Sequence, residues 1–347
     1  MISISELTPT RLRHLCTQAD TKAIHAERLN AWIFRQGNLN PASLPELPVA
    51  LCELLDREVD NALPALIDQR CAADGTQKYL LQLHDGEQVE TVMIPIAGRL
   101  TQCISTQAGC ALGCTFCLTA TGGLRRNLSR GDMVAQVMLG WQQFGQRARN
   151  LVLMGMGEPM HNFDAVADFV RFVTDPAGMA YSPRRVTLST VGVVPGIERL
   201  IAEQLPCSLA ISLNATTDAV RDQLMPVNRK YPIARLLEAM HGFAHAFPRR
   251  RMLVAYVLLA GVNDSLADAE RLVGLLKGMA CTVSLLPFNP WPDAPWQRPD
   301  DAVVGRFRAQ LSQAGLVAVV RESRGKEIAA ACGQLLHRQP ANVSIPI

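Results

Sequence analysis

Hydrophobic and polar positions repeat at two different spacings in the second part of this chain. From about residue 100 onward, short apolar runs typical of buried strands alternate with longer stretches in which apolar residues recur at helical spacing. The expected strands are 102–106, 150–154, 185–190, 208–213, 252–258 and 282–287, and the expected helices are 130–144, 163–174, 196–204, 233–246, 265–278 and 301–313.

This alternation predicts an α/β fold in which strand–helix units build a parallel sheet. Six units curl into an incomplete (β/α)6 barrel more readily than into the closed barrel of eight. In barrels, the reacting groups lie at the C-terminal ends of the strands. Polar residues or glycine turns follow four of the expected strands, in Gly155–Pro159, Ser189–Thr190, Ser212–Asn214 and Phe288–Asn289. We therefore expect a functional site on one rim of the barrel.

Two further segments precede the barrel. In residues 1–62, Thr8 can cap a helix that starts at Pro9, and helical spacing returns over 23–35 and 49–57, which predicts a small helical domain. In residues 63–97, two strands around Asp85-Gly86 predict a β-hairpin extension. An acid within a strand usually faces solvent, and we expect this of Glu90. Residues 98–347 then form the barrel domain with its C-terminal segment.

Composition and charge place the chain among ordinary globular proteins. It has 347 residues, 48% apolar and 19% charged, with a net charge of +3, which is no strong nucleic-acid signature. The start lacks the pattern of a secretory signal, and the longest apolar stretch, 252–262, is shorter than the ~20 residues that span a bilayer. We expect a cytoplasmic monomer without membrane contact, whose ten cysteines are reduced.

The strongest chemical signal is the C-x3-C-x2-C spacing of Cys110, Cys114 and Cys117. Three thiolates this close can hold three irons of a [4Fe–4S] cluster and leave the fourth iron open to a small molecule. A structural zinc would need a fourth ligand, and His84 and His161 are distant in sequence. Burial on one helical face also fits positions i, i+4 and i+7, although a glycine weakens that helix. The spacing favours the cluster and leaves both alternatives open.

Other candidate residues are ambiguous when taken singly. The glycines of 155–159 could bring backbone close to a ligand, with Glu158 accepting from an ammonium or a ribose hydroxyl, but a bare turn has the same pattern. Ser189, Ser212 and Asn214 could orient a nucleoside or cap the helices that follow them. Two isolated cysteines, at positions 103 and 332, fit buried apolar positions equally well.

Taken together, the motifs resemble the radical S-adenosylmethionine (SAM) enzymes of the RlmN/Cfr family. The resemblance covers nearly the whole chain and is greatest to the RlmN-type dual-specificity enzymes, which methylate C2 of adenine in 23S rRNA and tRNA. It is carried by Val89–Thr91, Cys103–Cys110, the three-cysteine motif, Gly155–Pro159, Leu188–Thr190, Arg221-Asp222, Met225–Asn228, Pro287–Pro290 and Arg324–Leu335.

This resemblance implies a partial (β/α)6 radical SAM barrel with two cofactors. Cys110, Cys114 and Cys117 would hold a [4Fe–4S] cluster. The residues implied to line the SAM pocket are Gly157, Glu158, Ser189, Ser212, Leu213, Asn214 and Asn289. Many relatives have histidine at the position of Asn214, and asparagine can bind there but cannot titrate near neutrality.

The resemblance also implies a reaction sequence, because C2 of adenine is too weak a nucleophile to attack a SAM methyl group directly. Cys332 first takes a methyl group from one SAM. A radical made from a second SAM then removes a hydrogen from that methyl group, and the carbon radical adds to adenine. Glu90 would accept a proton, and Cys103 would help to resolve the protein–RNA adduct.

The implied partners are 23S rRNA, tRNA and an electron donor such as flavodoxin. The helical segment 1–62 would either hold RNA or act only as a packing cap. Two other functions remain possible on these residues. Cfr-type methylation of adenine C8 uses nearly every motif named above, and a non-catalytic, metal-stabilised RNA-binding module would need only the cysteines.

Overall fold

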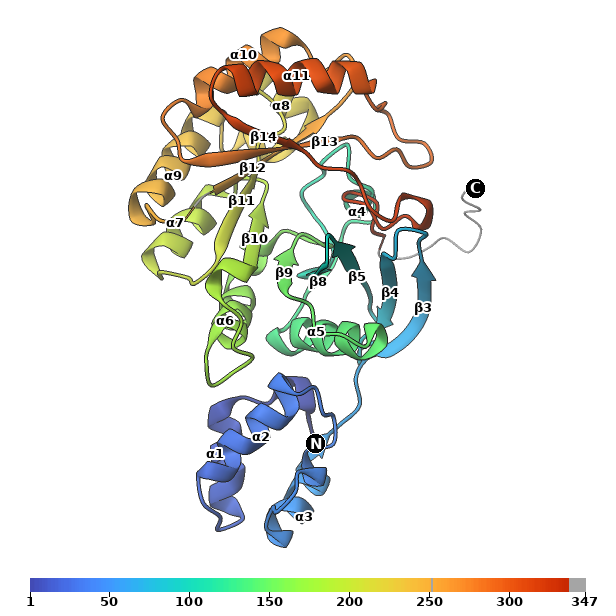
Figure 1. Ribbon diagram of the computed structural model, residues 1–347, viewed down its shortest axis with the longest axis vertical. Helices are drawn as coiled ribbons and strands as arrows, with labels where there is room; N and C mark the ends of the chain where they lie inside the picture. The colour runs from blue at the N-terminus through green and yellow to red at the C-terminus, as the bar shows by residue number, and fades with distance from the viewer. Residues whose placement is uncertain (251, 337–347) are drawn as a thin grey trace.

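The parallel part of the sheet confirms the predicted alternation of strands and helices (Figure 1). The computed structural model describes residues 1–250 and 252–336; the remainder of the predicted barrel domain, 337–347, lies outside them. Within these residues, seven neighbouring strands pair in parallel. They are β6 (Arg99–Cys103), β9 (Asn150–Leu153), β10 (Val186–Thr190), β11 (Ser208–Ser212), β12 (Met252–Leu258), β13 (Cys281–Pro287) and β14 (Val317–Val320).

Six helices follow the first six of these strands, as the six predicted units require. They are α5 (Arg130–Phe144), α6 (Phe163–Thr174), α7 (Val194–Ala202), α9 (Ile233–Ala246), α10 (Leu266–Leu276) and α11 (Asp301–Gln313). Capping boxes start α5 at Ser129 and α10 at Ser265, which fixes their first turns. Helix α7 starts two residues earlier than predicted, because Pro195 is tolerated in the first turn.

Other elements of the barrel domain also differ from the prediction. Strand β6 lies three residues before the predicted 102–106, because it pairs along its whole length, from Arg99 to Cys103, with the preceding antiparallel strand. The seventh strand, β14, and a short helix after β11, α8 (Asp218–Leu224), were not predicted. Both are short: α8 has seven residues, and β14 is a four-residue apolar run at the sheet edge that periodicity cannot distinguish from the end of the preceding helix.

The predicted hairpin is confirmed and continues the same sheet beyond β6. It consists of β4 (Gln77–Gln82) and β5 (Gln88–Ile96), and β5 pairs antiparallel with β6. A third strand, β3 (Ala65–Cys71), forms the outer edge. It escaped prediction because its residues alternate between exposed and half-buried positions, which leaves no buried face.

The N-terminal helices lie at one end of the molecule, beyond α5 (Figure 1). They are α1 (Pro9–Gln18), α2 (Ile24–Asn30, followed by a π-helical turn over Ala31–Arg35) and α3 (Val49–Glu58). Thr8 caps α1 as predicted, accepting from the backbone N–H of Arg11. Glu6 pairs with Arg130 of α5, and Asn30 donates to the carbonyl of Gly178 after α6. No helix among the described residues could cross a membrane.

Candidate active site

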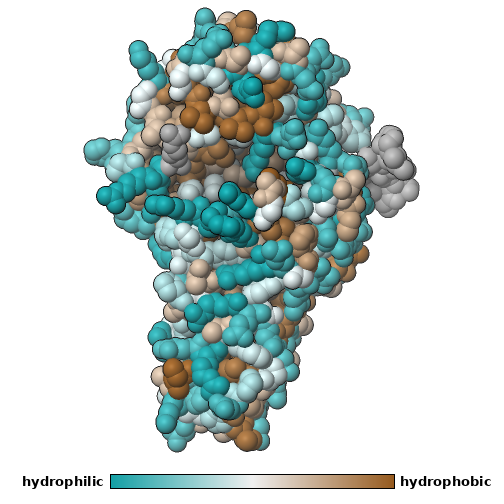
Figure 2. Space-filling model, viewed as in Figure 1, coloured by the Kyte–Doolittle hydropathy of each residue, from teal (hydrophilic) through white to brown (hydrophobic). Residues whose placement is uncertain are grey.

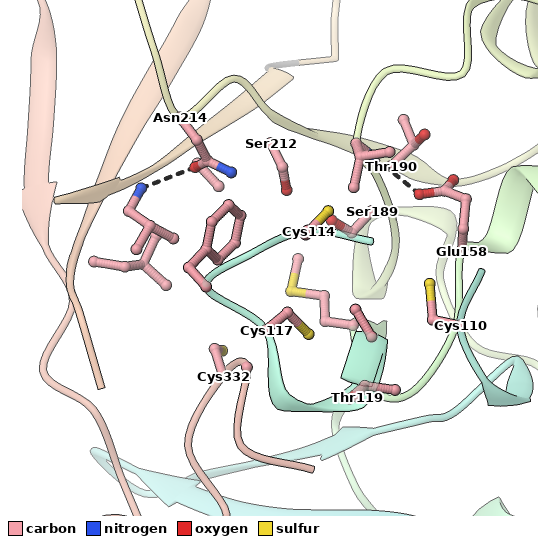
Figure 3. A pocket seen from close by; sticks show the side chains of 18 of the residues that line it. Cys110, Cys114, Cys117, Thr119, Glu158, Ser189, Thr190, Ser212, Asn214 and Cys332 are labelled. Atoms are coloured by element: carbon pink, nitrogen blue, oxygen red, sulfur yellow. Dashed lines mark hydrogen bonds between the residues drawn. The ribbon is translucent and has the colours of Figure 1, made fainter. Parts of the chain in front are cut away.

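A cavity opens at the C-terminal ends of the barrel strands, where the sequence predicted a site (Figure 3). Its empty volume is about 1150 Å³, including the part open to solvent. Residues from the ends of β9 to β13, from the three-cysteine loop and from the C-terminal segment line it. The space-filling view shows a recess with apolar side chains along its border in the half of the molecule formed by the barrel (Figure 2).

The three cysteines lie on a loop rather than on a helix. Cys110 directly follows β7 (Gln107–Gly109), which pairs with β8 (Leu124–Asn127). Cys117 precedes the short helix α4 (Leu118–Thr121). Between them Gly113 has a φ of +66°, which breaks any helical path. The alternative in which the cysteines share one helical face is therefore wrong.

All three cysteines line the cavity, and the site suits a cluster held by three thiolates (Figure 3). Burial raises the pKa of Cys110 to about 11 and raises those of Cys114 and Cys117, so these thiols need a cation to become thiolates. In residues 1–250 and 252–336, no three His, Cys, Asp or Glu side chains are arranged around one metal ion. A cubane cluster does not need that arrangement, because each thiolate binds a different iron.

Glu158 is placed in the cavity by the glycine turn after β9. Gly157 has a φ of +97°, and a Cβ atom there would lie 2.5 Å from Cβ of Gln107. Only glycine therefore lets this turn pack against β7. The carboxylate of Glu158 accepts from the backbone N–H groups of Met160 and Val191, both at 3.0 Å. Burial raises the pKa of Glu158 to about 7, although these hydrogen bonds favour the ionised form.

Short polar side chains from several strand ends meet at the same cavity. Ser189, Ser212, Asn214 and Asn289 line it, whereas Leu213 is fully buried outside the lining. Asn214 has a φ of +58°, which asparagine tolerates, and its Oδ1 accepts from the backbone N–H of Val257 at 2.9 Å. One acceptor of this amide is thus already used by the fold.

The segment that carries Cys332 lies across the cysteine loop. Cys332 is exposed and lines the cavity, so the interpretation of a buried apolar position is wrong. The backbone N–H of Leu118 donates to the carbonyl of Gly333 at 2.7 Å, and Thr119 Oγ1 donates to the carbonyl of Leu335 at 2.7 Å. Asn289 Nδ2 donates to the carbonyl of Cys332 itself at 3.3 Å.

Two other candidate residues, Cys103 and Glu90, lie outside the cavity lining. Cys103, at the end of β6, is buried; burial raises its pKa to about 12, and the nearby Cys332 thiol adds to that shift. Glu90, on β5, was expected to face solvent, and that expectation is wrong. It is buried against Lys78, whose Nζ lies 2.9 Å from its Oε1.

Arg221 belongs to one of the motifs of the resemblance, which assigned it no role at the site. Its guanidinium is fully buried and donates to the carbonyls of Val191 (2.6 Å), Ser212 (3.4 Å) and Leu213 (3.0 Å) and to Asn228 Oδ1 (2.9 Å). It thus ties together the ends of β10 and β11. Its acceptors are mainly backbone carbonyls, which leave no signal in side-chain spacing.

The fold and the cavity together define a radical SAM enzyme. The family model of the Radical SAM superfamily matches residues 104–273. The crystal structure of a radical SAM methyltransferase from Sphaerobacter thermophilus superposes with a TM-score of 0.90, at 39% identity, over 96% of this chain and 99% of that one.

The curated relatives narrow the class to one family. Dual-specificity RNA methyltransferase RlmN of Jannaschia sp. (strain CCS1) is 40% identical, with 96% of this chain and 89% of the relative aligned. The protein of the same name from Paracoccus denitrificans is 42% identical, over 95% of this chain and 88% of its own. The chain belongs to the RlmN family of radical SAM methyltransferases.

Proposed function

We propose that this protein methylates C2 of adenine in 23S rRNA and tRNA through an S-methylcysteine at Cys332, with two SAM molecules per turnover. The observation that carries the proposal is the position of Cys332. An exposed thiol shares one cavity with three clustered cysteines and with the polar strand ends, in a chain of the RlmN family.

In this proposal the cavity holds both cofactors. Cys110, Cys114 and Cys117 would bind a [4Fe–4S] cluster, which together with SAM supplies a radical able to remove a hydrogen atom. Glu158 would accept from the SAM amino group. The other residues proposed to hold SAM are Gly157, Ser189, Ser212, Leu213, Asn214 and Asn289, of which Leu213 could contribute only through its backbone.

Cys332 would act as the nucleophile in the first methyl transfer. Its thiolate attacks the methyl carbon, and the new S–C bond forms as the bond from that carbon to the sulfonium breaks. The contacts of Gly333 and Leu335 with α4 hold this thiol at the cavity mouth. The thiolate of Cys103, buried nearby, would later attack the sulfur of Cys332. The S–S bond would form as the S–C bond to the RNA-bound carbon breaks, and that carbon would keep the electron pair and take up a proton to become the methyl group.

The remaining parts of the proposal concern partners. RNA would reach the cavity from solvent, and an unstacked adenine is the easier target. Residues 1–62 would hold the RNA, an electron donor such as flavodoxin would supply electrons, and the protein would act as a cytoplasmic monomer. Cfr-type methylation at C8 remains the second candidate, because the same cavity would serve it.

The test compares Cys332→Ala with Cys71→Ala, which removes an exposed cysteine on the outer strand β3. Each variant and a chain lacking residues 1–60 complement a gene knock-out, and mass spectrometry identifies the methyladenosine isomers in rRNA and tRNA. We expect 2-methyladenosine with the wild type and C71A, none with C332A, and none with the truncated chain, which should still cleave SAM.

Four results would contradict parts of this proposal. Product from C332A would remove the S-methylcysteine step, and 8-methyladenosine would assign the Cfr-type reaction. Unchanged RNA methylation by the truncated chain would end the assignment of residues 1–62 to RNA binding. A colourless protein with zinc and without iron would favour the non-catalytic RNA-binding module.

A further inference from the structure

Lys78 and Glu90 form an ion pair that is almost completely buried. Their side chains are 5% and 4% exposed, and Lys78 Nζ lies 2.9 Å from Glu90 Oε1. In the register of β4 and β5, Lys78 stands opposite Val92 and Leu80 opposite Glu90, so the two charged residues are diagonal neighbours on one face. Buried ion pairs contribute little net stability, because desolvation offsets their attraction. Stability alone therefore gives no reason for this pair.

Both members of the pair also contact the segment that carries Cys332. Lys78 Nζ donates to the carbonyl of Ala329 at 3.1 Å, and Glu90 Oε2 accepts from the backbone N–H of Leu336 at 2.9 Å. These two backbone groups lie on either side of Cys332 in the sequence. Through these two hydrogen bonds, the ion pair of the hairpin holds the segment 329–336, which contains Cys332.

The two oxygens of Glu90 have unequal partners. Oε1 is held by an ammonium group, whereas Oε2 has one neutral backbone donor from the C-terminal segment. The contact at Oε1 joins two opposite charges in a buried place, whereas the contact at Oε2 joins the carboxylate to an uncharged N–H group, so Oε2 is the oxygen that changes partner more easily. A second cation, Arg70 on β3, acts on Glu90 electrostatically and also forms an ion pair with Asp68 at 2.9 Å.

We propose that Lys78 is a positioning residue that holds Glu90 Oε1 and so presents Oε2 as the proton acceptor of the RNA reaction. This inference rests on the proposed function. In the step concerned, the C–H bond at C2 of the protein–RNA adduct breaks. The proton moves to Oε2, the bonding electron pair restores the aromatic ring, and the unpaired electron of the adduct would pass to a one-electron acceptor, the oxidised iron–sulfur cluster that the three cysteines would hold. The backbone N–H of Leu336 must first release Oε2. The C-terminal segment therefore shifts before the proton is transferred.

The test uses Lys78→Met, Lys78→Arg, Glu90→Gln and the double variant K78M/E90Q in the cluster-loaded enzyme. Arg235→Met is the control, because it removes an exposed ion pair with Glu198 and Glu238. Three quantities are measured: methylation of the Cys332 peptide, RNA covalently bound to protein on denaturing gels, and 2-methyladenosine.

We expect K78M to methylate Cys332 normally, to accumulate RNA-bound protein, and to form 2-methyladenosine at least about tenfold more slowly. K78R should restore most of the activity, and the double variant should be no slower than E90Q, because both changes remove the same step. If K78M does not fold, K78Q replaces it, since glutamine keeps a donor for Ala329.

The proposal is overturned if K78M makes product at the wild-type rate, if it loses activity without the RNA-bound species, or if K78R is as slow as K78M. A wild-type enzyme that yields neither methylated Cys332 nor 2-methyladenosine would instead contradict the proposed function itself, before any variant is compared.

Discussion

Two regions contribute to one site in different ways: the rim of the barrel, and the β4–β5 hairpin together with the C-terminal segment of the chain. On the rim, the polar cavity residues lie at strand ends or in the turns after them, as Glu158 lies in the turn after β9 and Asn214 just after β11. In the hairpin region (β4, β5 and residues 324–336), the contacts join residues about 250 positions apart, as between Lys78 and Ala329. Figure 1 shows the C-terminal segment beside β4. Backbone topology places the rim, whereas hydrogen bonds that mostly involve side chains place the C-terminal segment.

The two regions also differ in what holds them. The rim relies on charged groups with mainly backbone partners, namely Arg221 with strand-end carbonyls and Glu158 with two N–H groups. The C-terminal segment is held by single hydrogen bonds from several elements. Loss of a rim group should therefore affect the whole fold, and loss of one segment contact should affect only the segment.

Arg221→Met should have the largest effect on stability. It leaves the carbonyls of Val191, Ser212 and Leu213 without their buried donor, and we expect a loss of about 3–5 kcal/mol in the free energy of unfolding. SAM affinity should fall as well, because Arg221 holds the backbone of Ser212 and Leu213, and Ser212 is one of the residues proposed to hold SAM. Denaturant unfolding and SAM titration measure the two effects.

Arg250→Met is the matched control for Arg221→Met. Arg250 donates to the carbonyls of Leu205 and Cys207, which lie before β11 and thus at the other end of this strand. The variant Arg250→Met should lower the free energy of unfolding and leave SAM affinity unchanged. Equal SAM affinities in the two variants would show that Arg221 does not organise the cavity.

Glu158→Gln should change the pH dependence of stability by the next largest amount. The pKa of Glu158 is raised from 4.5 to about 7, so its contribution to stability is complete below 4.5 and is lost as pH rises through 7. A shift of this size corresponds to about 3 kcal/mol. Iron-free wild-type protein should lose about this much more stability than E158Q between pH 4.5 and 8 in urea unfolding.

Glu53→Gln supplies the control for the pH experiment, since Glu53 is an exposed residue of helix α3. Its pH profile should run parallel to that of the wild type. Parallel profiles for wild type and E158Q would instead mean that Glu158 is already ionised at low pH.

The difference between the regions explains how far the sequence alone could predict this molecule. Local signals were sufficient for α5 and α6, whose predicted and observed bounds agree, and for the three-cysteine loop at the cavity. Strand β3 has no buried face, and β14 is an apolar run of four residues, too short for periodicity to distinguish a strand from a helix segment. The burial of Lys78 depends on partners in two other segments, and no local pattern encodes that.

Thr119→Val should have the smallest effect, and it tests the second half of the comparison. The change keeps the shape of the side chain but removes the donor to the carbonyl of Leu335. One such hydrogen bond is worth about 1 kcal/mol, which corresponds to about fivefold more frequent opening of the C-terminal segment. Amide hydrogen exchange of residues 329–336 measures that opening, and exchange in β12 should be unchanged.

Thr121→Val is the matched control, because Thr121 lies on the same short helix and donates to Leu118 at 2.7 Å within it. It should leave exchange in 329–336 as in the wild type. If T119V instead raised exchange in β12 as much as in the segment, the C-terminal segment would be part of the cooperative core. The distinction between a rim built by topology and a segment held by separate side chains would then be wrong.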